Sequence, residues 1–205
     1  MMKLFSSPAS PFVRKVTMTA AIKGLSGQIT PVFADATKGD AALAAANPLG
    51  RLPSLVTDKG VTIADSHVIC EYLDTIGSGP VLFPRSGDAR WQTLTLGSLG
   101  DGLMECALAI VYERRFRPEN MVVQSWLDRQ SGKITSALGH LEAHPPAWSG
   151  HPDYGHLTLA TALGYLDFRH AGAWRKGHPK LVAWLDGFAA AVPAFGATAP
   201  KDPPK

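Results

Sequence analysis

The stretch SPFVRKV, residues 10–16, decides how the first part of the chain is interpreted. Serine followed by proline is a helix-start signal, because serine caps the first turn and proline suits the first helical position. Apolar residues then recur at helical spacing until Gly24. A strand candidate at residues 3–6 precedes this stretch, and a second at residues 28–33 follows it. The pattern predicts a β-α-β unit.

The same kind of signal continues to residue 77. A short Ala-rich helix or irregular turn is expected, then two strands joined by the hairpin signal Asp58-Lys59-Gly60, then a helix that opens at Asp65-Ser66 and ends at Gly77. The order β-α-β-α-β-β-α predicts an α/β domain over residues 1–77. The Gly- and Pro-containing residues 78–87 are expected to form a linker.

Strand signals vanish in residues 88–205, where four apolar stripes at helical spacing predict an all-α bundle. The last residues, from Thr198 on, are rich in proline and are expected to form a tail over the surface. Asp153 precedes one of the apolar helices and can cap it, but His156, three residues on, is a less certain reciprocal partner than a carboxylate would be.

Composition excludes several classes of protein. The chain has 205 residues, 45% of them hydrophobic and 18% charged, with a net charge of +3, which argues against disorder and against nucleic-acid or acidic-membrane binding. No apolar run is expected to approach the ~18 residues of a membrane helix, and the N-terminus turns polar too early for a signal peptide. Two separated cysteines, Cys70 and Cys106, form no CxxC motif and are expected to be buried thiols of a cytoplasmic protein.

Four segments, in this order and at these intervals, give a specific resemblance: SPFVRK (10–15), NPLGRLP (47–53), Asp65-Ser66 and GYLDFR (164–169). Together they resemble a bacterial glutathione S-transferase over nearly the whole chain. The resemblance implies a thioredoxin-like N-terminal domain with a mixed four-stranded sheet that binds glutathione. It also implies an all-helical C-terminal domain that forms the electrophile pocket, and a homodimer. Glutathione would be the co-substrate, and no metal is expected.

Ser10 is the expected catalytic residue. Glutathione attacks as its thiolate, and a hydroxyl donor near a helix N-terminus lowers the pKa of a thiol. Ser10 could also be a helix cap only, yet capping uses an oxygen lone pair and leaves the hydroxyl proton free to donate. Ser7 and Ser6 are the alternative positions. Because serine cannot form a mixed disulfide, the residue favours conjugation over thiol exchange.

Five residues are expected to hold the tripeptide. The resemblance places a cis peptide bond at Leu52-Pro53, which would offer the backbone of Leu52 to the cysteinyl unit of glutathione, although an ordinary trans turn is the alternative. Asp65 would attract the γ-glutamyl ammonium and Ser66 its carboxylate, unless the pair is a simple helix cap. Arg51 could pair with the glycyl carboxylate or be a solvated surface charge.

The electrophile pocket is expected to be lined by apolar side chains at helical spacing, although such residues are more often core than binding surface. The candidates are Phe12, Met104, Ala107, Val111, Tyr112 and Trp174. His140 and His144 are spaced like a metal pair, but the glutamate between them is misplaced for a zinc-protease motif, so no metal site is expected.

The sequence therefore predicts an enzyme that activates the thiol of glutathione for attack on a small hydrophobic electrophile. Two alternatives stay open. One is a non-catalytic binding or regulatory subunit of the same build, and the other is a glutathione-dependent isomerase or lyase that uses the same peptide site with another pocket.

Overall fold

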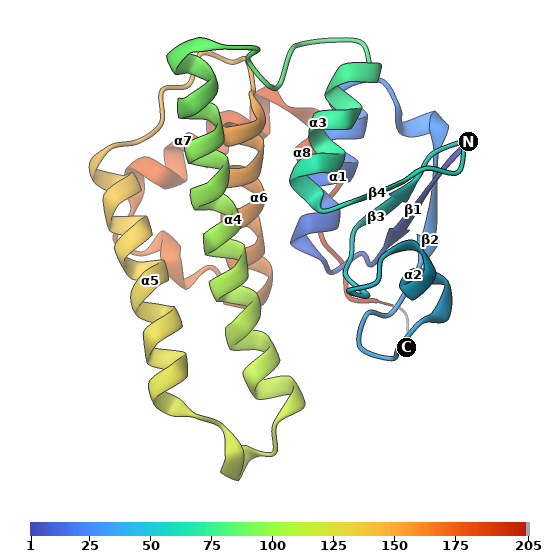
Figure 1. Ribbon diagram of the computed structural model, residues 1–205. Helices are drawn as coiled ribbons and strands as arrows, with labels where there is room; N and C mark the ends of the chain where they lie inside the picture. Colours follow the sequence, from blue (N-terminus) through green and yellow to red (C-terminus); the bar gives the residue numbers. More distant parts are fainter. Residues whose placement is uncertain (204–205) are drawn as a thin grey trace. The chain divides into compact units, whose positions relative to one another are not determined.

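The structure of the protein is a computed structural model that describes residues 1–203 (Figure 1). Its contacts divide the chain into two compact units. The N-terminal unit comprises Met1–Arg85 and the segment that begins at Ala194, and the helical unit comprises Ser86–Pro193. The division at residue 86 falls within the predicted linker. The structure differs from the predicted domains at the C-terminus, where the last residues pack with the first unit.

The N-terminal unit is built on a four-stranded sheet in the order β2-β1-β3-β4. The strands are β1 (Met2–Ser6), β2 (Ile29–Phe33), β3 (Ser54–Val56) and β4 (Thr62–Ala64). β1 and β2 are parallel, whereas β3 runs antiparallel to both β1 and β4. The predicted mixed sheet is thus confirmed, and its parallel pair is the β-α-β unit expected around residues 10–16.

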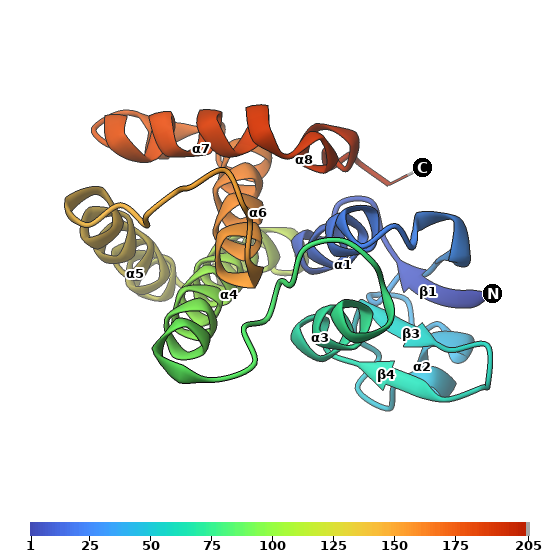
Figure 2. The same cartoon turned by 90° about the horizontal axis from the view of Figure 1, so that it is seen from above.

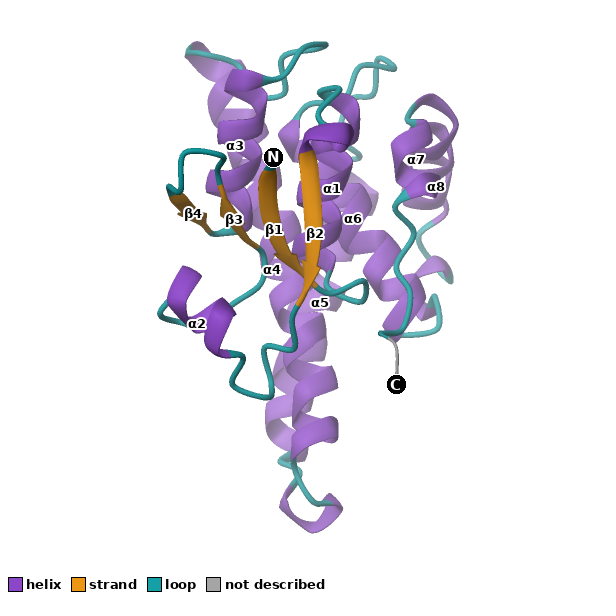
Figure 3. Ribbon diagram, turned by 90° about the vertical axis from the view of Figure 1, so that its right-hand side faces the viewer, coloured by secondary structure: helices purple, strands orange, loops and turns teal. Residues whose placement is uncertain are grey.

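Helices cover both faces of this sheet. On one face lie α1 (Pro11–Ile22) and α3 (Ser66–Ile76), which pack on each other (Figure 3). On the other face Leu43 of α2 (Ala41–Ala46) packs with Phe5 and Ala34. Successive side chains along a strand point to opposite faces of the sheet, so Leu4 points to the first face and Phe5 to the second. Both are buried, which fixes the register of β1.

The predicted linker is anchored to the N-terminal unit at its start. Lys23, one residue beyond α1, pairs with Asp74 of α3 at 3.0 Å, and their side chains are 3% and 9% exposed. The Lys23 ammonium also donates to the Pro80 carbonyl, and Asp74 accepts the backbone N–H groups of Leu82 and Phe83. These bonds satisfy a buried charge pair and hold residues 78–83 against the ends of two helices.

The helical unit contains four long helices, α4 (Gly87–Phe116), α5 (Gln124–Ala143), α6 (Tyr154–Arg169) and α7 (Pro179–Ala191) (Figure 2). α6 is its core, since every residue from Tyr154 to Leu166 except His156 is buried. Besides α2, the short helices among residues 1–203 are η1 (Ser26–Gln28), η2 (Glu119–Met121), η3 (Ala173–Arg175) and α8 (Pro193–Ala197). The predicted all-α bundle is confirmed.

The expectation that no stretch is long and apolar enough for a membrane helix was wrong, because one helix meets both criteria. α4 contains an 18-residue window of mean hydropathy 1.4, of which 28% is buried in the structure. Length and composition alone do not define a membrane span, because core helices of soluble proteins meet the same test. The buried residues of α4, including Leu103, Met104 and Ala107, belong to the hydrophobic core, and α4 packs on α5 and α6.

Small residues let α4 and α6 approach closely, and this gives a first prediction. A Cβ atom at Gly97 would overlap the ring of Tyr154, whereas one at Gly102, on the same helix, would meet nothing within 4 Å. We expect Gly97→Ala to lower the free energy of unfolding by about 1–3 kcal/mol through overpacking. Gly102→Ala should raise it by up to about 1 kcal/mol through helix propensity. Urea unfolding of both variants checks this, and equal effects would contradict it.

The cap of α6 forms despite its unusual partner. Asp153 accepts from the backbone N–H of His156 at 2.9 Å, and the Nδ1 atom of His156 lies 3.3 Å from the backbone nitrogen of Asp153. When the ring is neutral with its proton on Nε2, Nδ1 can accept from the Asp153 N–H, and the reciprocal arrangement of a capping box is then complete with histidine in the role usually taken by a carboxylate or amide.

Candidate active site

The topology of the N-terminal unit gathers the predicted glutathione-binding segments at one edge of the sheet. β1 ends at Ser6 and leads into the loop before α1. β3 is antiparallel to β1, with Ser54 opposite Phe5, so the residues that precede β3 lie at the same edge. β4 pairs Ala64 with Ser54, which brings the start of α3 there as well. Residues 6–10, 51–53 and 65–66 thus lie at one edge of the sheet, although they are up to about sixty positions apart.

Ser10 is the N-cap of α1, with extended backbone angles and the Pro11 ring in the first turn. Its Oγ accepts from the backbone N–H of Val13 at 3.3 Å. Its own N–H donates to the Ser7 carbonyl, which closes the turn between β1 and α1. Among the described residues no acceptor takes the hydroxyl proton of Ser10, so that proton is available to a ligand at the positive end of the helix.

The alternative serines differ in their partners. The Ser6 hydroxyl lies 3.5 Å from the Val32 carbonyl and can donate to it, across the parallel pair of strands. The Ser7 hydroxyl has no partner among the described residues, but Ser7 precedes the helix and has no helical N–H groups beside it. Ser10 combines a free donor with the helix N-terminus, which supports the first choice made from the sequence.

The Leu52-Pro53 bond is cis, as predicted. Within the described chain the backbone N–H and C=O of Leu52 have no hydrogen-bond partner, while the neighbouring Arg51 carbonyl accepts from Asn47 and from Ser54. An extended peptide could therefore pair with Leu52 as a short added strand. The side chain of Arg51 is exposed and forms no ion pair within residues 1–203.

Asp65 and Ser66 lie at the start of α3 in an unusual backbone conformation. Asp65 has φ 76° and ψ 133°, a region that residues other than glycine rarely adopt and that costs about 1–3 kcal/mol. Its carboxylate caps the helix by accepting from the His67 N–H at 2.8 Å. The Ser66 side chain is buried, yet its hydroxyl has no partner among the described residues. Capping thus engages one carboxylate oxygen of Asp65 and leaves the Ser66 hydroxyl without a partner in this part of the chain.

The six candidates for the electrophile pocket are divided between the two units. Phe12 belongs to the N-terminal unit, and the other five belong to the helical unit. Met104 and Ala107 are fully buried on α4, whereas Val111 and Tyr112 are partly exposed. Trp174 is buried and donates its ring N–H to Asp167 at 2.8 Å. For Met104, Ala107 and Trp174 a core role explains the environment within the helical unit.

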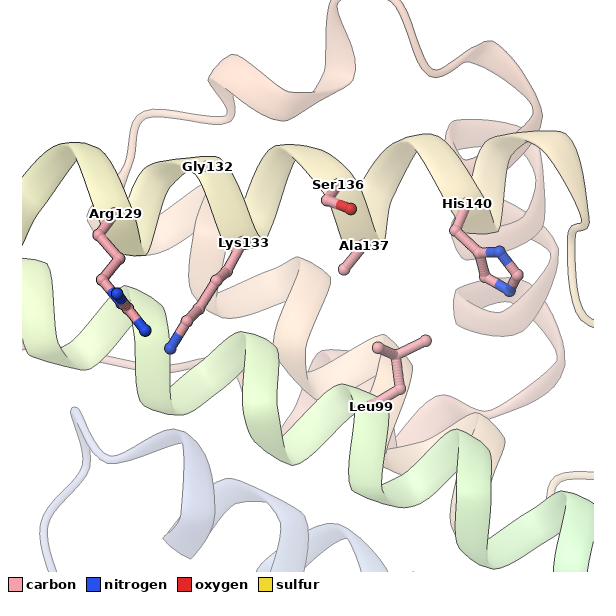
Figure 4. Close-up of a pocket in the computed structure, with 7 residues that line it drawn as sticks. All are labelled: Leu99, Arg129, Gly132, Lys133, Ser136, Ala137 and His140. Atoms are coloured by element: carbon pink, nitrogen blue, oxygen red, sulfur yellow. The ribbon is translucent and has the colours of Figure 1, made fainter.

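Two grooves lie between α4 and α5, and neither contains any of those six residues. The larger, of about 690 Å³, has an apolar floor and a basic side formed by α5 (Figure 4). It is lined by Leu99, Arg129, Gly132, Lys133, Ser136, Ala137 and His140. The smaller, of about 470 Å³, includes Cys106, which is half-buried rather than buried as expected. Burial raises the pKa of the Cys106 thiol, so the thiol stays protonated near neutral pH. Among residues 1–203 no group of three or more potential ligands could hold a metal ion.

Sequence reasoning missed the contacts that the C-terminal segment makes with the loop before α1. The backbone N–H of Lys201 donates to the Pro8 carbonyl, and Arg14 binds the carbonyl and ring of Phe195. No local pattern could have revealed these contacts, because they join positions about 180 or more residues apart in the chain.

The N-terminal unit is a thioredoxin-like sheet with a free hydroxyl at its first helix, and a helical unit follows it. This order of domains is that of a glutathione S-transferase. Two family models agree with it. The glutathione S-transferase N-terminal domain matches residues 9–76, and the glutathione S-transferase C-terminal domain matches residues 124–187. The uncharacterized GST-like protein YibF of Escherichia coli (strain K12) is 34% identical over 190 residues, which are 90% of this chain and 92% of that protein. The chain belongs to the glutathione S-transferase family.

Solved structures of bacterial relatives share the fold. A glutathione transferase family member from Pseudomonas fluorescens Pf-5, solved with bound glutathione, has a TM-score of 0.93 and 40% identity, covering 98% of this chain and 100% of that one. A second structure from that organism holds S-(propanoic acid)-glutathione, with a TM-score of 0.88, 39% identity and the same coverage.

Proposed function

We propose that the protein is a glutathione transferase that ionises the thiol of glutathione and directs it at a small hydrophobic electrophile. The observation that carries this proposal is the hydroxyl of Ser10, which caps α1 as an acceptor and keeps its proton for donation. The bound glutathione and the bound S-substituted glutathione of the Pseudomonas relatives support the same ligand here.

In this proposal the tripeptide lies along the edge of the sheet. The cysteinyl unit pairs with the free N–H and C=O of Leu52. The γ-glutamyl carboxylate accepts from the Ser66 hydroxyl and from the first amides of α3, and the ammonium faces Asp65. Arg51, exposed and without an ion pair in the described chain, would pair with the glycyl carboxylate. Val111 and Tyr112, which are partly exposed on α4, remain the proposed contacts of the electrophile within the helical unit.

The chemical step is a substitution or an addition at carbon. Ser10 donates to the sulfur and, with the N-terminus of α1, stabilises the thiolate after the thiol proton has passed to solvent. The thiolate electron pair forms the new C–S bond, and either a leaving group departs with its electrons or the adjacent carbanion takes up a proton. Binding both reactants supplies proximity.

Titration of the protein with glutathione, followed by thiolate absorbance, tests this function. A thiolate band at neutral pH, together with turnover of one member of a panel of halogenated and unsaturated electrophiles, is expected. Binding without a band would favour the non-catalytic binding subunit. A band with isomerised or eliminated products, and no conjugate, would favour the isomerase or lyase.

Ser66 provides a separate prediction for binding. Ser66→Ala removes a donor to a carboxylate, and hydrogen bonds to charged groups contribute about 1.5–3 kcal/mol. We therefore expect the dissociation constant for glutathione to rise about 10- to 100-fold in isothermal calorimetry, with kcat changed far less. Ser26, an exposed serine that also begins a helix, is the matched control. Equal binding by Ser66→Ala and Ser26→Ala would remove Ser66 from the site.

We also propose a cytoplasmic homodimer. Exposed apolar side chains of the helical unit support the dimer. Examples are Trp91 on α4 and Trp126 on α5, which are 65% and 44% exposed. Sedimentation equilibrium at micromolar concentration should give about twice the chain mass of 21.8 kDa, and a monomer would contradict this proposal.

A further inference from the structure

The C-terminal segment, residues 194–203, packs with the N-terminal unit although the helical unit precedes it in the chain. It contacts α1 at one point and the loop before α1 at another. At the first, the Arg14 guanidinium donates to the Phe195 carbonyl at 2.8 Å and lies over the Phe195 ring at 4.1 Å. At the second, the Lys201 N–H donates to the Pro8 carbonyl at 3.2 Å.

Both points are close to Ser10. Pro8 lies in the turn that the Ser10 N–H closes onto Ser7, and the backbone N–H of Arg14 donates to the Ser10 carbonyl at 3.0 Å. The Arg14 side chain is 5% exposed, and cation–π contacts are stronger when desolvated. The segment therefore holds the turn before Ser10 and the helical turn after it.

We propose that residues 194–203 are a positioning element of the thiol site, which fixes the Ser7–Ser10 turn so that the Ser10 hydroxyl faces the sulfur of glutathione. Exposed turns are mobile unless tethered, and a misplacement of about 1 Å at a reacting group can lower the rate about a hundredfold. The effect of the segment on the thiol of glutathione rests on the proposed function, whereas its effect on the Ser7–Ser10 turn does not.

Two substitutions at one position isolate the second contact. Lys201→Pro deletes the N–H that donates to Pro8, whereas Lys201→Ala keeps it and removes only an exposed side chain. At the first contact, Phe195→Ala removes the ring beneath the guanidinium and leaves the carbonyl. None of these residues is proposed to touch glutathione.

The first measurement needs no ligand. Hydrogen exchange of the amides in residues 9–13 of the full chain should be about 2- to 10-fold faster in Lys201→Pro and in Phe195→Ala, as expected for the loss of one weak tether, and unchanged in Lys201→Ala. Unchanged exchange in both test variants would overturn the structural claim, whatever the protein binds.

The second measurement separates positioning from simple stabilisation. In Lys201→Pro we expect the pKa of the bound thiol to rise and kcat to fall about 2- to 10-fold, with KM for glutathione unchanged. Faster exchange with an unchanged thiol pKa and kcat would overturn the positioning role. If the unmodified protein formed no thiolate, the proposed function would fail instead, while the exchange result would still decide whether the segment holds the turn.

Discussion

Ser10→Ala should lower turnover about 10- to 100-fold near neutral pH and raise the pKa of bound glutathione by about 1 to 2 units. The estimate follows from the worth of a hydrogen bond to a charged group, about 1.5–3 kcal/mol, at 1.36 kcal/mol for each pKa unit. The pH dependence of thiolate absorbance and of kcat/KM gives both quantities. Binding of glutathione should weaken much less, because the other contacts of the tripeptide stay in place.

Loss of the cap must be separated from loss of the donor. Ser10→Ala also removes the acceptor for the Val13 N–H, at a cost of about 1 kcal/mol in stability. Ser10→Asp keeps a capping oxygen but offers no proton and adds a negative charge beside the sulfur. It should therefore restore thermal stability and leave activity at least as low as in Ser10→Ala. Recovery of activity in Ser10→Asp would show that capping alone matters. Ser7→Ala, in the same turn, should have little effect.

His156→Ala should lower the free energy of unfolding by about 2–3 kcal/mol near pH 6, as expected for the loss of one member of a partly buried charged pair. The ring is held on both nitrogens, with Nδ1 at 2.7 Å from the Asp153 carboxylate and Nε2 at 2.8 Å from the Ala147 carbonyl. It also stacks on Trp184 and meets Trp148 edge-on. Two acceptors around one ring favour the doubly protonated imidazolium.

The effect should depend on pH in a definite direction. Burial by itself lowers the pKa of His156, but the hydrogen bond and charge of Asp153 outweigh burial, and the pKa lies above its ordinary value. Burial likewise raises the pKa of Asp153, but hydrogen bonds from His156 and Thr93 outweigh it, and the pKa lies below its ordinary value.

A raised histidine pKa contributes stability that is complete below the unfolded value, about 6.5, and is lost as pH rises through the folded value. A lowered aspartate pKa contributes stability that is present above about 3.9 and is lost as pH falls through the folded value. The pair therefore stabilises most between about pH 4 and 6.5. Above the folded pKa of His156, the neutral ring can carry its proton on Nε2 and accept from the Asp153 N–H at Nδ1, so the helix cap persists in a weaker form.

Urea unfolding of the unmodified protein and His156→Ala, from about pH 5 to pH 9, checks this prediction. The difference between them should shrink as pH rises, and it should stay constant for the control His151→Ala, whose side chain is exposed two residues before Asp153. A difference for His156→Ala that did not change with pH would mean that the ring acts by packing only.

Local chemistry made much of this fold predictable. Three features depend only on a few neighbouring residues, and local sequence patterns therefore predict them. They are the Ser-Pro start of α1, the hairpin before β4 and the glycine that ends α3. The cis bond at Leu52 was accessible only through the family resemblance. Two features could not be predicted from local patterns. One is the return of residues 194–203 to the start of α1, whose partners lie about 180 or more residues away. The other is the stacking of His156 on Trp184, which joins two different helices.

The site residues, too, could be predicted only where a local pattern or the order of elements determines their position. Ser10, Leu52 and Ser66 are brought together by strand pairing, which the β-α-β-α-β-β-α order implies. The electrophile candidates were chosen by helical spacing, a pattern that core residues share, and Met104, Ala107 and Trp174 lie in environments that packing explains. Spacing alone cannot separate the two roles, because both require an apolar side chain on one face of a helix.

A crystal structure of the protein with glutathione tests the central claim most directly. The sulfur should lie within about 3.5 Å of the Ser10 Oγ, in hydrogen-bond geometry that sulfur allows, with the cysteinyl backbone paired to Leu52. A tripeptide whose sulfur contacted Ser7 or Ser6 instead, or lay remote from the N-terminus of α1, would contradict the account.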